Sequence, residues 1–557
     1  VATLRGPGFR STTTVTAPTH PSGHWAAALD ALADRVLYAL YSAQADLDPW
    51  LPRGALPTTP QGIQAWFRGE RAYNRAQWDE AFLLYRDAVA LDSTCLLCLY
   101  RLNDVERWLG RGASDERLAT LSRHQDRFPE PYRALIRGYA TPPANHYDSL
   151  KAVAAGHKDF AMAFFAAGDE AFHRAALHGH PRREATELLL RTVRLKPGFA
   201  PGWEHLAWLG AALGDSALTR SSLDSLRLAP VETGFSAALH QLLRLGFAWR
   251  FQPEAAAREA TERVLALPGI WNLPDVAAGA RALMTMGSPA GAEYLGRRFT
   301  EQGARPDLLR SGLLGAYFGA VGQGKDPEAA AIGEQLRRVE SGLDLELFLA
   351  ESALVLPLLR GDTIPRASRE RIVTLRTDQP PRSILGQRLD WLAYMTDPAH
   401  LPEIRPTGDL GVLLTADSLA RRGAFGRAVE MTERLSPLEP GPAPDPFFPL
   451  LLRWKRADWL EALGRPGAAA RELAGYQHLQ LVGLPTGAPQ AGEVDWSFGP
   501  YQAWRQSRLL ARSQSTGVDL CAGLAEVVHF GRNGPEWHRG RAAPARQLAT
   551  ARGCAAS

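Results

Sequence analysis

The sequence predicts an all-α fold in which pairs of helices stack side by side into a solenoid. One stretch, from Ala65 to Asp92, places small and large apolar residues at the spacing of two adjoining helices. Weaker copies of this pattern recur along the chain, and the stretches between them keep the helical period. A helical pattern repeated over most of a chain indicates an extended stack rather than one compact core.

Composition narrows the class of protein. The chain has 557 residues, of which 45% are hydrophobic and 22% charged, as in folded soluble proteins. A net charge of +4 predicts no nucleic-acid partner. The most apolar stretch, residues 353–359, ends at Arg360, so we expect no transmembrane segment. Four cysteines are too few for a disulfide scaffold.

Residues 1–45 predict a short β-containing segment followed by a helix. Residues 12–16 are rich in threonine and valine, which favours an extended chain. From Ser22, a candidate helix cap, apolar residues recur at helical spacing as far as about residue 45. Residues 46–60 are rich in proline, which is typical of a linker.

The clearest helical hairpin follows this linker. Gly69 and Ala81 are small residues twelve positions apart, where the two helices must touch closely. Trp78 follows the expected turn, and Tyr85 and Ala88 lie on the same helical face as Ala81. The expected packing residues of this hairpin are Gly69, Tyr73, Trp78, Ala81, Tyr85 and Ala88.

Weaker hairpins with small or aromatic residues at the crossings are expected further along. These hairpins extend the predicted solenoid to residue 512. A proline-rich joint at 379–381 interrupts the stack, so we expect two parts, residues 61–378 and 379–512. Helical pairs without clear signatures fill the stretches between the copies. The further expected packing residues are Gly210, Gly214, Gly423, Phe425, Ala428 and Gly464.

This register resembles the tetratricopeptide repeat, a helical hairpin of about 34 residues. Ser93 stands where that family prefers proline. The resemblance implies a right-handed solenoid whose concave face holds an extended peptide or a helix of a partner protein. With the linker before Ala65, the array is similar to the repeat regions of bacterial signalling regulators, either serine/threonine kinases or winged-helix activators. The catalytic motifs of a kinase do not occur in the sequence.

The C-terminal residues 513–557 differ in character. We expect one helix over 520–530, followed by a loosely ordered tail rich in Arg, Gly and Ala. Cys521 and Cys554 fall here and would pair if the chain is exported, but cysteines in a tail are more often free thiols.

Cys95 and Cys98 have the spacing of a redox or zinc-binding pair. A zinc site needs two more ligands, and no second such pair occurs in the sequence. Because leucines surround both residues, we interpret them as buried free cysteines in a helix.

Residues 319–326 nearly match a phosphate-binding loop, with Lys325 in the expected place. Asp326 replaces the hydroxyl residue that would hold magnesium, and a helical rather than a strand pattern precedes the stretch. We therefore favour a turn between two helices.

Two groups of side chains suggest binding but have plainer interpretations. His173, His178 and His180 cluster near a helix end, without an acidic or thiol ligand to complete a metal site, so we interpret them as helix-end residues. Three tryptophans outside the clear repeats are candidates for an exposed anchor or a terminal cap: Trp496, Trp504 and Trp537.

Together these patterns predict a non-enzymatic helical-repeat scaffold that binds partner proteins of unknown identity. An open concave face lacks the enclosed pocket that catalysis needs, and we identify no catalytic, cofactor-binding or metal-binding residue. Two alternatives remain. One is a stable accessory subunit whose ends are ordered by neighbours, and the other is a solenoid that responds to a small ligand or nucleotide. The cytoplasm is narrowly favoured over the periplasm.

Overall fold

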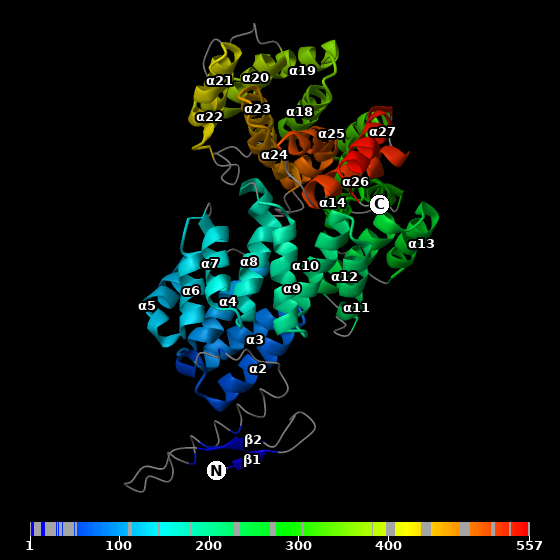
Figure 1. The fold of residues 1–557 in the computed structure, drawn as a ribbon. Coiled ribbons are helices and arrows are strands. Elements are labelled where there is room, and N and C mark those ends of the chain that lie inside the picture. The colour runs from blue at the N-terminus through cyan, green and yellow to red at the C-terminus, as the bar shows by residue number, and fades with distance from the viewer. Residues whose placement is uncertain are drawn as a thin grey trace. The chain divides into compact units, whose positions relative to one another are not determined.

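Figure 1 shows the fold in a computed structural model. The described residues form 26 α-helices, four 3-10 helices and one pair of strands, so the all-α fold of stacked helical hairpins is confirmed. The structure describes residues 2–4, 13–16, 29, 32, 36, 50, 53–109, 114–142, 145–178, 180–227, 234–267, 274–301, 306–380, 383–396, 407–435, 447–477, 491–513, 518–533 and 536–554.

The chain divides into two compact units, each described here by itself. Helices α8 to α12 contribute residues to both units. The break in the solenoid expected from the sequence between residues 378 and 379 stays a prediction. The first unit comprises Val1–Asp169, Glu187–Leu206 and Ser222–His240, and the second comprises Glu170–Thr186, Ala207–Ser221 and Gln241–Ser557.

The N-terminal segment contains the expected extended chain. Strand β1 (Ala2–Leu4) pairs antiparallel with β2 (Thr13–Val15), so each strand satisfies the backbone groups of the other. Three residues of the helix expected over 22–45 are helical, and the rest of that expectation lies outside the described residues.

Helices α2 to α7 belong to the first unit, and each packs against the next along the chain. The helices of this part are η1 (Arg53–Ala55), α2 (Pro60–Asn74), α3 (Trp78–Leu91), α4 (Leu96–Trp108), α5 (Asp115–Arg123), η2 (Gln125–Arg127), α6 (Glu130–Tyr139) and α7 (His146–Gly156). The following helices are α8 (Ala161–Arg174), η4 (Ala175–His178), α9 (Arg183–Leu195), α10 (Ala200–Leu213), α11 (Ser216–Leu226) and α12 (Gly234–Phe251).

The start of α2 is joined to the end of α3 by hydrogen bonds. The Thr59 side chain caps α2 by accepting a hydrogen bond from the Gly62 amide at 3.1 Å. Asp92, which follows α3, accepts hydrogen bonds from the hydroxyls of Thr94 at 2.6 Å and Thr58 at 2.9 Å. Burial opposes ionisation, but these bonds hold the pKa of Asp92 well below its usual range.

In the second unit the helices from α14 onward again pack in chain order. Helix α14 also contacts α16, so the first helices of successive pairs meet, as in a stack of hairpins. The bounds are α13 (Glu254–Leu265), α14 (Pro274–Thr285), α15 (Pro289–Glu301), α16 (Pro306–Gly322), α17 (Asp326–Val339), α18 (Leu343–Arg360), α19 (Arg366–Thr377), α20 (Ile384–Thr396), α21 (Gly408–Arg421), α22 (Phe425–Thr432), α23 (Phe448–Ala462), α24 (Pro466–Ala474), η6 (Gly475–Gln477), α25 (Ala491–Arg512), α26 (Val518–Asn533) and α27 (Glu536–Ala551).

Helix α16 approaches α15 so closely that two of its contacts leave no room for a side chain. A Cβ atom on Gly319 would lie 2.5 Å from the amide nitrogen of Glu293. A Cβ atom on Gly296 would lie 2.3 Å from the carbonyl oxygen of Gly312. Backbone atoms cannot move aside as a flexible side chain can, so glycine is required at both positions.

Helix α25 contacts helices that lie far from it in the sequence. It packs against α14, α16 and α18, which are the first helices of three pairs, and also against α23 and α24 (Figure 1). The Tyr501 hydroxyl donates a hydrogen bond to the carbonyl oxygen of Val321 at 2.6 Å and accepts one from Arg360 at 3.1 Å. The side of α14, α16 and α18 that faces α25 is thus covered by the chain itself.

The prediction of a loosely ordered C-terminal tail is wrong for the described residues, which form two helices. Helices α26 and α27 form a hairpin that packs on α25 and shares an apolar cluster with it, including Leu524, Val528 and Ala545. The Arg-, Gly- and Ala-rich composition is compatible with this packing because small residues let helices approach. A Cβ atom on Gly531 would lie 2.5 Å from the Cβ of Ala542.

We expect Gly319→Ala to destabilise the second unit by about 1–3 kcal/mol, because its methyl group would force α16 and α15 apart. Thermal unfolding followed by circular dichroism measures the effect. Gly426→Ala is the matched control, since no atom lies within 4 Å of the added Cβ and the residue is exposed in α22. Equal midpoints for the two variants would contradict the close crossing.

Candidate functional site

The structure brings the expected residues of the first hairpin together. A Cβ atom on Gly69 would lie 2.8 Å from the Tyr85 ring, so α2 and α3 cross at this glycine. The Tyr73 and Trp78 rings lie 5.4 Å apart, edge to face. Ala81 and Ala88 are fully buried on the same side of α3.

The other expected packing residues divide into two kinds. Gly210 lies at a crossing, where a Cβ atom would come 2.6 Å from the Thr219 hydroxyl. Ala428 is buried and Phe425 is half-buried at the start of α22. Three of the glycines follow helix ends in the left-handed conformation that favours glycine, with φ of +74° at Gly214, +83° at Gly423 and +71° at Gly464.

A buried ion pair joins α2 to α4 in the first unit. Arg101 donates to the Glu70 carboxylate at 2.8 Å, and the Tyr85 hydroxyl donates to the same oxygen at 2.7 Å. The guanidinium also lies 4.7 Å from the centroid of the Tyr73 ring. Burial opposes the charge on Glu70, but Arg101 and Lys196 lower its pKa below the usual value. Both members of the pair therefore stay charged inside the unit.

Five aromatic rings form a closed circuit beside this ion pair. Trp78 stacks on Trp108 with centroids 5.0 Å apart, and Trp108 lies 5.7 Å from Phe165 of α8. Phe165 meets Phe199 at 4.8 Å, and Phe199 returns to Tyr73 at 5.9 Å. These rings fill the space between α2, α4 and α8 and form part of the packed core of the first unit.

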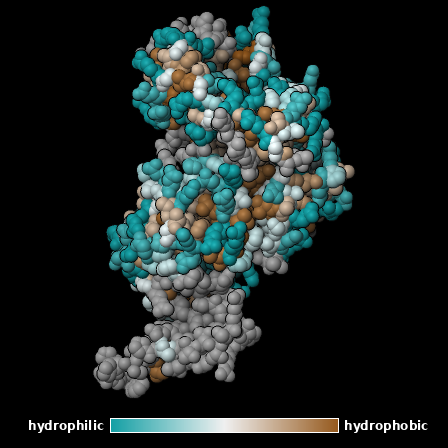
Figure 2. All heavy atoms as spheres, in the orientation of Figure 1, coloured by the Kyte–Doolittle hydropathy of each residue, from teal (hydrophilic) through white to brown (hydrophobic). Residues whose placement is uncertain are grey.

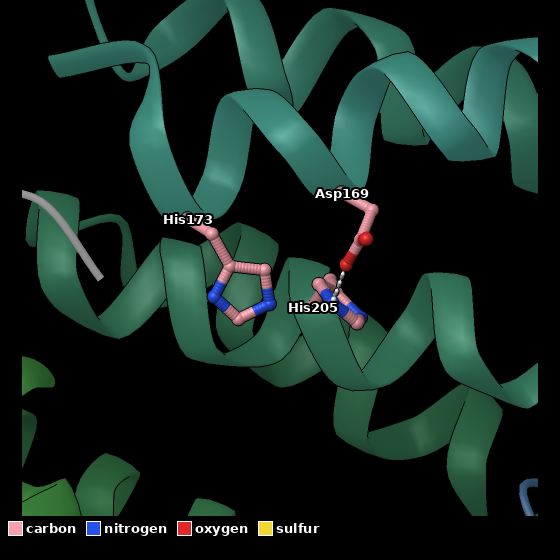
Figure 3. Close-up of side chains that lie close together, drawn as sticks. All are labelled: Asp169, His173 and His205. Atoms are coloured by element: carbon pink, nitrogen blue, oxygen red, sulfur yellow. Dashed lines mark hydrogen bonds and ion pairs between the residues drawn. The ribbon is translucent and has the colours of Figure 1, made fainter. Parts of the chain in front are cut away.

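Asp169 and His205 form a buried charged pair in the first unit (Figure 3). The Nδ1 atom of His205 lies 2.7 Å from the carbonyl oxygen of Pro201, and Nε2 lies 3.1 Å from Asp169. Both partners can only accept hydrogen bonds, so both ring nitrogens must donate. Burial disfavours this charge, but the hydrogen bond from His205 to Asp169 raises the histidine pKa. A doubly protonated ring has no lone pair for a metal ion.

The three histidines singled out in the sequence do not act as one group. His173 lies one helical turn beyond Asp169 on α8, and His178 lies in η4. His180 lies 3.6 Å from Glu184, a helix-end contact. Sequence reasoning missed the Asp169–His205 pair, because its members are 36 residues apart and no local motif joins them.

The stretch 319–326 contains the turn between two helices that the sequence favoured, at residues 323–325. Helix α16 runs to Gly322, and α17 begins at Asp326. The Lys325 ammonium donates to Glu293 at 2.7 Å, and Arg360 binds the Asp326 carboxylate through two hydrogen bonds of 2.7 and 2.8 Å. The charges that a phosphate would need are engaged within the chain.

The expectation for the cysteines is corrected. Cys95 and Cys98 are buried as expected, but they are joined in a disulfide rather than free. Cys521 and Cys554 form a second disulfide, which connects α26 to the residues after α27. The sequence offered this pairing only if the chain is exported, because the hairpin that brings the two residues together across 33 positions was not expected.

The three tryptophans outside the clear repeats pack inward, as a terminal cap would. Trp496 is buried in α25, with Arg182 lying 4.9 Å from its ring centroid. Trp504 packs on the cluster shared by α25, α26 and α27. Trp537 lies 5.0 Å from Tyr501. Of the two expectations, the cap is the one that their placement favours.

The surface is mainly hydrophilic on the face shown in Figure 2, with hydrophobic residues in separate patches. Among the described helices, none has the length and apolar character needed to cross a membrane. Among the described residues, the large exposed hydrophobic side chains are scattered along the chain: Leu29, Leu83, Leu91, Leu118, Leu267, Val373 and Leu463.

Comparisons with known proteins bear on the fold. No family model matches the sequence, and no curated protein matches it either. Chains of solved structures do match, among them the tetratricopeptide-repeat domain of P58(IPK). That domain is 12% identical, and the match covers 76% of this chain and 99% of that one with a TM-score of 0.20. At this score the hairpin stack rests on the helices described above and not on the similarity.

We expect Arg101→Met to destabilise the first unit by about 3–5 kcal/mol, because it leaves Glu70 charged and buried without its partner. Denaturant unfolding measures the loss. The double variant Glu70→Gln with Arg101→Met should recover most of it, since no unpaired charge remains. Arg86→Met, in an exposed pair with Asp87, is the control and should change nothing measurable. A single variant as stable as that control would contradict the buried pair.

We expect the oxidised protein to contain no reactive thiol at any of its four cysteines, because Cys95 pairs with Cys98 and Cys521 with Cys554. Alkylation in denaturant without a reductant, read by mass spectrometry, should label none of them, and alkylation after reduction should label all four. Digestion without reduction should also yield a linked pair of peptides containing Cys521 and Cys554. Labelling of either residue before reduction would overturn that pairing.

Proposed function

We propose that this chain is a non-enzymatic helical-repeat scaffold that binds another protein. The observation that carries the proposal is the stack of hairpins itself, in which each helix of the second unit from α14 onward packs on its neighbour. Such stacks present long side surfaces that suit protein partners. In finer terms, we propose the sensory or assembly part of a bacterial regulator, on the sequence resemblance alone.

One cavity of the second unit is too small for a substrate. The cavity, lined by Met284, Tyr476, Trp496 and Phe530 among others, has a volume of about 10 Å³. By the same measure one water molecule needs about 10–15 Å³. This cavity therefore offers no place for a small-molecule substrate.

The packing of helices within the chain indicates which surface is left for a partner protein. In the second unit α25 covers α14, α16 and α18, the first helices of three successive pairs. In the first unit the circuit of aromatic rings fills the space between α2, α4 and α8. We therefore propose that the partner contacts the outer helices of the pairs, such as α17 and α19, rather than an open concave groove.

The two alternatives have less support. An accessory subunit was suggested by ends that need neighbours for order, whereas α26 and α27 pack on α25 within the chain. A nucleotide-responsive solenoid was suggested by the turn at 319–326, whose charged residues pair with Glu293 and Arg360.

The disulfides also bear on the compartment. Disulfides persist in oxidising compartments and are rare in the cytoplasm. Both described disulfides therefore favour an exported chain with a partner outside the cytoplasm, in place of the cytoplasm that the sequence narrowly favoured.

We expect the tagged full-length chain, isolated gently from its native source, to carry a second protein in fixed stoichiometry. Native mass spectrometry gives the mass of the complex and identifies the companion. A tagged Gly426→Ala chain, whose fold should be intact, serves as a positive control, and the tag alone gives the background. A particle of 60.8 kDa that carries no protein even after chemical cross-linking would contradict the scaffold.

A further inference from the structure

Two histidines lie at the end of the C-terminal hairpin that is opposite the disulfide. His529 lies near the end of α26, and His538 lies near the start of α27. The other end of the hairpin is closed by Cys521 and Cys554 and shares the apolar cluster with α25. One end is therefore tied covalently, whereas the other end holds two side chains that can titrate.

His538 is packed as a neutral ring. It is 3% exposed and stacks on Tyr501 of α25, with ring centroids 5.0 Å apart, and its ring also lies 5.9 Å from Phe530. Its Nε2 atom is buried without a hydrogen-bond partner. A proton on that nitrogen would be charged, unsolvated and unpaired, which is the costliest state for a buried polar group.

The charges around His538 are mainly positive. Arg360 of α18 and Arg541 of α27 both disfavour a charged His538. The acidic residues in this region are engaged with these arginines, because Asp326 pairs with Arg360 and Asp362 acts on Arg541.

His529 is half-buried in α26, and its ring lies 5.6 Å from that of Phe530. Arg250 of α12 and Arg532 of α26 both oppose a charge on its ring. Glu526, one turn earlier on α26, is the acidic residue of this region and acts on Arg250. The two histidines thus meet arginines from α12 and α18, elements outside the hairpin.

We propose that the α26–α27 hairpin is an acid-released latch, in which protonation of His529 and His538 frees the end that carries them while the disulfide end stays on α25. Release would uncover Tyr501 and the small cavity beside it, which Glu526 and Phe530 line from α26. Acid would thereby open an aromatic surface that the chain covers at neutral pH.

The direction of the pH effect follows from the two pKa values. Burial, followed by the neighbouring arginines, lowers the pKa of His538 to about 4 and that of His529 to about 3. A released histidine has a pKa of about 6.5. The released state therefore binds protons more tightly, so docking is fully stable above pH 6.5 and weakens as the pH falls toward 4. At pH 5.0 each histidine should weaken docking roughly 30-fold, and the two together about 1,000-fold.

Hydrogen–deuterium exchange of the full chain at pH 7.5 and pH 5.0, corrected for intrinsic rates, tests the latch. We expect peptides from the adjoining ends of α26 and α27 to lose about 1,000-fold of their protection at pH 5.0, relative to pH 7.5. Peptides from α21 and α22, which contain no histidine, are the internal control and should keep theirs. Unchanged protection of the hairpin in the wild-type chain would overturn the proposal without any variant.

His538→Phe keeps an aromatic ring on Tyr501 and removes the proton, so the loss should fall to about 30-fold. His529→Phe should have the same effect through a separate site, which keeps the test open if one variant does not fold. His124→Gln, at an exposed position outside this hairpin, is the matched control and should respond as the wild type does. A full acid response in the double Phe variant would show that other groups release the hairpin.

Discussion

The close approach of paired helices is the constraint on which this structure depends. Where α16 meets α15, and where α2 meets α3, the distances at Gly319 and Gly69 leave no space for a side chain. Helices this close exclude water from the face they share, but each hairpin still has a second apolar face to bury. Stacking on the next hairpin buries that face, so the crossings generate the stack.

A stack leaves its inner side uncovered, and in the second unit the chain itself covers the side formed by α14, α16 and α18. In the second unit α25 lies against three successive first helices, and Tyr501 and Arg360 attach it through directed hydrogen bonds. In the first unit aromatic rings fill the space between α2, α4 and α8. The buried Glu70–Arg101 pair joins α2 to α4. Surfaces that are already covered are poor docking sites, which directs our functional proposal to the outer helices.

The sequence predicted the class of fold because small and aromatic residues at helical spacing directly reflect packing between neighbours. It also placed the turn at 319–326, where the pattern changes from one helix to the next. It could not predict that α25 returns to α14, α16 and α18, since contacts between Tyr501 and Val321 span 180 residues and follow no period. The Asp169–His205 pair was missed for the same reason, because it depends on helices brought together by tertiary packing. The Cys521–Cys554 disulfide was considered but not favoured, because the hairpin that brings the two residues together was not expected.

The most direct test of this account is amide exchange of the chain with and without its bound protein partner. The account predicts that α25 keeps the same slow exchange in both states, because the partner leaves the covered side of α14, α16 and α18 untouched. New protection should appear on outer helices such as α17 or α19. Faster exchange in α25 on binding, together with protection of α16, would show that the partner displaces α25 from an inner groove and would contradict the account.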